Sequence, residues 1–129
     1  MYYLAYKKIV VKLLSKALRK KLPRKVAIIG VSATESQKLN LIYRRKNKPA
    51  NVLSFRYGPE YGEIIVCPAV VRAEAKRQGN TYKYQMTWMV LHGIIHLAGV
   101  HHEGSRAVDK KVVQLEHRVM RKLFSSLKF

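Results

Sequence analysis

The residues best suited to chemistry lie in one short segment, because four of the five histidines fall between His92 and His102. On a helix, His92 and His96 would be one turn apart, so both imidazoles would project from the same face and could bind one metal ion. Gly99 can adopt the left-handed conformation that ends a helix and turns the chain back towards such an ion. Three neutral imidazoles and one open position are typical of a catalytic zinc site.

The spacing does not decide which of the adjacent residues His101 and His102 is the third ligand. Neighbouring side chains point in different directions, so we expect only one of them to bind the metal. A lone histidine on an apolar helix is usually a hydrogen-bonded core residue. The clustering of four histidines favours a metal site, and a closed structural zinc site would more often use cysteine, of which the chain has one.

The same histidine spacing occurs in the metzincin proteases, in which a glutamate directly after the first histidine acts as the general base. Here that position is Gly93, which has no side chain. The sequence therefore disfavours peptidase chemistry of that type.

Hydrophobic periodicity and capping signals predict the elements that must position these histidines. Ser32 and Glu35 have the spacing of a capping box, Pro68 suits the first position of a helix, and Gly79 suits its end. We expect helices over residues 4–22, 32–45, 68–79, 82–98 and 105–124, and strands over 26–31, 51–55 and 63–67. Interleaved in this way, they indicate one α+β or α/β domain over residues 1–129, with a small mixed sheet, a hairpin-like pair of strands and the histidine pair on a buried helix.

The charge of the chain indicates an anionic partner. The sequence has 26 Lys and Arg against 7 Asp and Glu, a net charge of +19, and nucleic acid is the commonest partner of such a protein. An acidic membrane surface is the rival interpretation, although no apolar stretch is long enough to span a membrane. The lone Cys67 excludes an internal disulfide. Because the basic N-terminal segment lacks the features of a secretory signal and is too rich in lysine for a typical transit peptide, we expect a cytoplasmic protein.

Three motifs in the same order give the chain a specific resemblance. Residues 92–102 form the pattern His-Gly-x-x-His-Leu-x-Gly-x-x-His, which resembles the signature of YbeY-type endoribonucleases. The family's second signature resembles residues 39–44, Leu-Asn-Leu-Ile-Tyr-Arg, followed by residues 48–55, Lys-Pro-Ala-Asn-Val-Leu-Ser-Phe. Its Gly-Asp-Ile element is similar to Gly62-Glu63-Ile64. The resemblance covers about residues 25–120.

The resemblance implies one zinc ion per chain, bound by His92, His96 and His102, and a functional arginine at Arg44. It implies an α+β fold in which a mixed four-stranded sheet is flanked by helices, of which the elements above give about five, with the metal on a central helix and the turn after it. It also implies a single-strand-directed endoribonuclease that processes ribosomal RNA, including the 3′ end of the small-subunit RNA, during ribosome maturation. A zinc-bound hydroxide would attack the phosphodiester.

Further roles follow from residue type. Arg44 would clamp a phosphate bidentately, and Arg45, Lys46 and Lys48 would extend a track for the RNA backbone. His101 replaces the aspartate that the family usually has before its last histidine. Together with Glu63, which replaces the family's Asp, it is a candidate for orienting a ligand or accepting a proton. Ala50 replaces the family's Thr and so removes a hydroxyl.

Two alternatives stay open on the sequence. Tyr57 and Tyr61 could stack on unpaired bases, or they could simply cover the edge of the core. The whole protein could instead be a ribosome-associated RNA-binding assembly factor in which zinc only stabilises the fold. A fourth protein ligand on the metal would favour the assembly factor, whereas a coordinated water would favour the enzyme.

Overall fold

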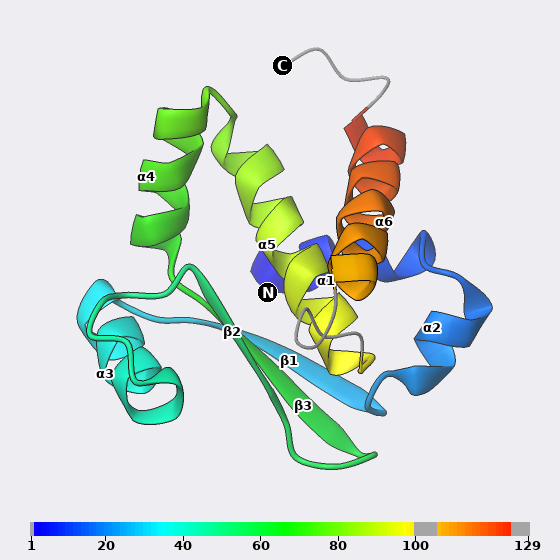
Figure 1. Cartoon of the computed structure of the whole chain (residues 1–129), viewed down its shortest axis with the longest axis horizontal. Coiled ribbons are helices and arrows are strands. Elements are labelled where there is room, and N and C mark those ends of the chain that lie inside the picture. The colour runs from blue at the N-terminus through cyan, green and yellow to red at the C-terminus, as the bar shows by residue number, and fades with distance from the viewer. Residues whose placement is uncertain (1, 100–105, 125–129) are drawn as a thin grey trace.

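The structure is a computed structural model that describes residues 2–99 and 106–124, and Figure 1 shows the arrangement of its elements. The described residues form six helices and three strands. The helices are α1 (Tyr2–Lys12), α2 (Lys16–Lys21), α3 (Ala33–Arg44), α4 (Pro68–Gln78), α5 (Tyr82–Leu97) and α6 (Arg106–Phe124), and the strands are β1 (Lys25–Gly30), β2 (Val52–Arg56) and β3 (Tyr61–Val66).

The sheet has the order β1-β3-β2 and is mixed, as the sequence predicts. Strands β2 and β3 form the expected antiparallel hairpin, with Phe55 opposite Glu63, and β1 runs parallel to β3, with Ile28 opposite Ile64. The α+β class is confirmed. Within the described part of the chain, however, the sheet has three strands rather than the four that the resemblance implies.

Helix α5 packs across β2 and β3 and carries much of the core (Figure 1). The burial of the central strand β3 shows which face of the sheet α5 covers, because the residues of β3 alternate between buried and half-buried. Ile64 and Val66 are completely buried on the α5 side of the sheet. This alternation is the mark of a sheet with one face against the core and the other face towards solvent.

The N-terminal segment differs from the single helix predicted over residues 4–22. Helix α1 ends at Lys12 in a tight turn, and α2 begins after Ser15, whose hydroxyl accepts a hydrogen bond from the backbone N–H of Leu18. A serine at this position stabilises a new helix start. The continuous helix would also have kept lysines at four-residue spacing on one face, which weakens a helix. The described helices are therefore six rather than about five.

The other predicted helix ends are confirmed. The Ser32 hydroxyl accepts a hydrogen bond from the backbone N–H of Glu35 at 3.1 Å and caps α3. Pro68 is the first residue of α4, and Gly79 ends that helix in the left-handed conformation, with φ of 71°. These local signals depend on neighbouring residues alone, which is why the sequence predicts them well.

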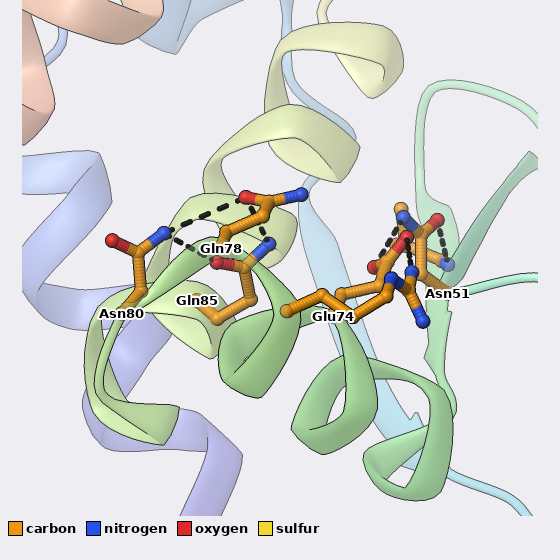
Figure 2. A network of polar contacts seen from close by, with 7 residues as sticks. Asn51, Glu74, Gln78, Asn80 and Gln85 are labelled. Carbon is orange, nitrogen blue, oxygen red and sulfur yellow. Dashed lines mark hydrogen bonds and ion pairs between the residues drawn. The ribbon is translucent and has the colours of Figure 1, made fainter.

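Two polar networks fix α4 between the sheet and α5 (Figure 2). At the start of β2, the Asn51 side-chain amide donates to Glu74 of α4 at 3.0 Å. Just after the C-terminal end of α4, the Asn80 amide donates at 2.9 Å to Gln85, a fully buried residue of α5. The middle of α4 and the residues just after it are thereby connected to elements that carry the candidate site. None of the described helices is both long and apolar enough to cross a membrane.

Candidate active site

His92 and His96 leave the same face of α5, as their spacing predicts, and their Nε2 atoms lie 3.1 Å apart. Two imidazole nitrogens bound to one tetrahedral zinc at about 2.0–2.1 Å would be about 3.3 Å apart. The pair therefore fits two ligands of one metal ion with little movement. Both histidines belong to α5, whose neighbouring residues Ile94, Ile95 and Leu97 are buried in the core.

Glu116 of α6 contacts the Nδ1 of His92, on the side of the ring away from His96. Its carboxylate is almost completely buried and lies 2.8 Å from the Nδ1 of His92, while the indole Nε1 of Trp88 donates to its other oxygen at 2.8 Å. A carboxylate can only accept, so His92 carries its proton on Nδ1 and has the Nε2 lone pair towards His96. A carboxylate behind a histidine in this way is the usual arrangement around protein-bound zinc.

Gly93 explains how the helix comes close enough to the sheet. A Cβ atom built at Gly93 would lie 2.8 Å from Cγ2 of Ile64 and 3.1 Å from Oγ of Ser54. The same Ser54 hydroxyl donates to the Gly93 carbonyl at 3.2 Å. A glutamate at this position would collide with the sheet. The packing therefore also argues against peptidase chemistry of the metzincin type.

The histidines line a cleft of about 440 Å³ between α3, β2 and the end of α5. Arg44, the last residue of α3, lines the same cleft, so the structure brings the predicted arginine to the predicted metal ligands. The cleft is lined by Tyr43, Arg44, Val52, Leu53, Ser54, Phe55, Arg56, His92, His96 and Leu97. Its apolar floor and basic rim suit an anionic substrate with an apolar part.

Arg56 is a cleft residue for which the sequence gives no signal. Its guanidinium donates to the carbonyl of Leu97, at the end of α5, and to the carbonyl of Lys21 at 2.6 Å. A cation at a helix C-terminus is electrostatically favourable. Arg56 therefore fixes the end of α5 to strand β2 just before Gly99, which has the expected left-handed conformation with φ of 87°.

The basic loop after α3 is anchored by two buried polar side chains. The Asn40 amide donates to the carbonyl of Lys48 at 2.8 Å, and Ser36 exchanges hydrogen bonds with the backbone of Ala50. Arg45, at the end of α3, has φ of 57°, which is unusual for a residue other than glycine. The predicted RNA-binding residues Arg45, Lys46 and Lys48 are all exposed. The loop thus presents its cations to solvent next to Arg44.

Glu63 does not lie with the histidines. It is opposite Phe55 in the hairpin and on the face of the sheet away from α5, as its place next to buried Ile64 requires. The hydroxyls of Tyr57 and Tyr61 both donate to its carboxylate at 2.8 Å. These hydrogen bonds raise the pKa of both tyrosines above the usual 10. Glu63 therefore has no geometric support as a partner of the metal ligands.

His101 and His102, the two candidates for the third ligand, lie outside the described residues. Within residues 2–99 and 106–124, no three His, Cys, Asp or Glu side chains gather around a common metal position. The donor set that is described, two facing Nε2 atoms with a carboxylate behind one ring, fits zinc and leaves its remaining positions to other groups.

Glu116, like Arg56, is a residue of the site that sequence analysis missed. Its signal is an acid among the apolar residues that α6 turns inward, since it falls four positions after Val112 and three before Val119, both buried. In a chain with 7 acidic residues, a carboxylate on the buried face of a helix indicates a partner in the core.

Comparison with known proteins relates the chain to one family. The family model described as Endoribonuclease YbeY matches residues 3–124. The chain is similar to an Endoribonuclease YbeY of Thermotoga petrophila, with 36% identity over 77% of this chain and 67% of the relative, and to one of Bdellovibrio bacteriovorus, with 37% identity over 65% and 57%. A solution structure of a Thermotoga maritima protein superposes with a TM-score of 0.64 at 28% identity, covering 95% of this chain and 81% of the other.

Proposed function

The chain belongs to the YbeY family of endoribonucleases, and from that premise we propose that it cuts single-stranded RNA in a zinc-dependent reaction at the cleft between α3, β2 and α5. The observation that carries the proposal is the 3.1 Å separation of the His92 and His96 Nε2 atoms, in a cleft that Arg44 also lines. The zinc ligands are His92, His96 and His102.

The protein's own groups have separate tasks in this proposal. Glu116 keeps the Nε2 lone pair of His92 available for the metal by accepting the Nδ1 proton. Arg44 binds a phosphate oxygen pair and stabilises negative charge as it develops on the phosphodiester. When bound, zinc would lower the pKa of a water molecule towards about 7 and so supply the attacking oxygen. The basic residues after α3 hold the RNA backbone across the cleft.

The proposed substrate is ribosomal RNA, at or near the 3′ end of the small-subunit molecule, in ribosome maturation in the cytoplasm. The excess of cations supports an RNA partner, because affinity for RNA comes largely from phosphate neutralisation. The assembly-factor alternative uses the same RNA contacts without cleavage.

The test is cleavage of a labelled single-stranded RNA by zinc-loaded protein, beside His96→Ala and Arg44→Glu. Both variants should remain folded, lose cutting, and differ in zinc content, since only His96→Ala removes a ligand. A Glu35→Gln variant, exposed on the first turn of α3, is the control for an unrelated charge change. Cutting that survives His96→Ala would exclude this site, and tight RNA binding without any cutting would favour the assembly factor.

A further inference from the structure

The face of the sheet opposite α5 is partly open, although it carries large apolar and aromatic side chains. Ile29 of β1 is 38% exposed, and the β3 residues on this face are half-buried while their neighbours on the α5 side are covered. The residues that share this face by register are Lys25, Ala27, Ile29, Leu53, Phe55, Tyr61, Glu63 and Ile65, of which Leu53 is buried. We call these residues, with Tyr57 at the end of β2, the open face.

Two tyrosines form a fixed stack at one end of the open face. The rings of Tyr57 and Tyr61 lie 5.8 Å apart with an interplanar angle of 21°, and Tyr57 is 64% exposed. Both hydroxyls donate to the carboxylate of Glu63, which holds the two rings in place from their polar ends. One side of the Tyr57 ring therefore packs on Tyr61 and the other side is available to a further planar group.

The open face continues into the cleft. Phe55 lies on the open face and also lines the cleft, and the ring of Tyr43, at the end of α3, meets it edge-on at 4.9 Å. Tyr43 is itself 62% exposed and precedes Arg44 in the chain. A chain of aromatic rings thus leads from the proposed catalytic arginine along strand β2 to the Tyr57–Tyr61 stack.

The surrounding charges favour a polyanion over an apolar protein surface. Lys25 of β1 is opposite Tyr61 in the sheet and exposed, and the cations of residues 44–48 flank the other end. Glu63 is the acid of the open face, and its two oxygens are engaged by the tyrosines. Exposed aromatic rings between cations are the arrangement by which proteins bind single-stranded nucleic acid.

We propose that the open face is a base-stacking platform for single-stranded RNA, on which Tyr57 stacks an unpaired base of the strand that passes through the cleft. The inference rests on the proposed function for the identity of the ligand and extends that function to a second part of the surface. Stacking is tolerant of sequence, because every base has an aromatic face. The platform thus selects for unpaired bases, which gives the cleft a physical reason to act on single strands.

The experiment is a fluorescence-anisotropy titration with a labelled single-stranded RNA of about 10 nucleotides, a length in the range of known single-strand sites. Tyr57→Ala should weaken binding about fivefold or more, the factor that corresponds to about 1 kcal/mol of lost stacking. Tyr57→Phe keeps the ring and should bind within about twofold of wild type on the same scale. Val113→Ala, which shortens an exposed apolar side chain on α6, is the control for loss of exposed apolar surface away from the open face.

A second measurement locates the contact. RNA carrying 5-iodouridine should photo-crosslink to Tyr57 or Tyr61, identified by mass spectrometry of the peptide, and duplex RNA should not. Unchanged affinity in Tyr57→Ala, together with crosslinks elsewhere, would overturn the platform and leave the open face as a surface for a protein. Thermal unfolding of each variant shows whether it is folded.

The outcomes separate this inference from the proposed function. If wild type binds RNA but does not cut it, and Tyr57→Ala weakens binding, the platform stands and the nuclease proposal fails. If wild type cuts and Tyr57→Ala both binds and cuts equally well, the nuclease stands and the platform fails. If wild type does not bind single-stranded RNA, both are wrong.

Discussion

The Nδ1 of His92 and the Oε2 of Glu116 lie 2.8 Å apart, so the last helix of the described chain supports a proposed metal ligand on α5. The carboxylate is buried and also accepts from Trp88, which means that its position is set by the core rather than by solvent. A buried carboxylate is costly unless it is paired. The cost is offset here by two hydrogen bonds, and the arrangement fixes the tautomer of His92 that can bind zinc.

Replacing Glu116 by Gln should therefore weaken zinc binding by about 10- to 100-fold, because the amide accepts less strongly from His92 and no longer fixes its tautomer. Competition with a chromogenic chelator measures this affinity without any assay of activity. Trp88→Phe is the matched control, since it removes the other donor to the same carboxylate but leaves the bond to His92 intact. It should cost about 1–3 kcal/mol of stability with a smaller effect on zinc. Equal zinc affinity in Glu116→Gln and wild type would remove Glu116 from the site.

The Gly93→Ala substitution should destabilise the protein, although alanine normally stabilises a helix by about 1 kcal/mol relative to glycine. The added Cβ would meet Ile64 at 2.8 Å, and forcing a methyl group into a packed core costs about 1–3 kcal/mol. Urea denaturation gives the sign directly. The double variant Gly93→Ala/Ile64→Ala should lose less stability than the sum of the losses in the two single variants, because the smaller side chain at position 64 makes room for the methyl group. A stabilised single variant would contradict the close approach of α5 to the sheet.

Local signals predicted much of the fold, and long-range packing decided the rest. The capping serine at Ser32 and the glycine at Gly79 act within one turn of their own helices, so the sequence predicts both ends. The break at Ser15 is also local, but the prediction followed the apolar stripe that continues across it and did not consider Ser15 as a cap. A serine cap can interrupt a periodic pattern whose two halves pack in different directions.

In the candidate site, too, local patterns predicted some residues and long-range packing placed the others. The spacing of His92 and His96 on one helix was sufficient to predict that their rings converge, and the motif resemblance pointed to Arg44. The direction of Glu63 was not predictable, because residues 64–66 after it are all apolar and the sequence therefore does not show which side of the strand faces the core. Glu116 lies 24 residues from His92, and no pattern within either helix connects them.

Glu63 should control the titration of the two tyrosines that bind it. Its carboxylate accepts a hydrogen bond from each hydroxyl and so raises the pKa of Tyr57 and Tyr61. Glu63→Gln should lower both values towards 10, which NMR of the tyrosine rings can follow at alkaline pH. A raised pKa in the folded protein means that the contribution to stability is present below the unfolded value near 10 and is lost as pH rises through the folded value. Glu60→Gln, in the same loop but paired with Arg24, is the control and should leave both tyrosines unchanged.

A single substitution at Arg45 should affect protein stability and RNA binding differently. Its φ of 57° is a left-handed conformation that costs a residue with a side chain about 1 kcal/mol or more, and glycine adopts it without that cost. Its side chain is exposed and belongs to the basic loop. Arg45→Gly should therefore keep or raise the unfolding temperature while it weakens RNA binding and reduces the slope of log affinity against log salt by about 1. Lys38→Gly, an exposed cation within α3, is the contrasting variant, because it should lower stability by about 1 kcal/mol through helix propensity. Loss of stability in Arg45→Gly would mean that the arginine side chain supports the loop rather than the RNA.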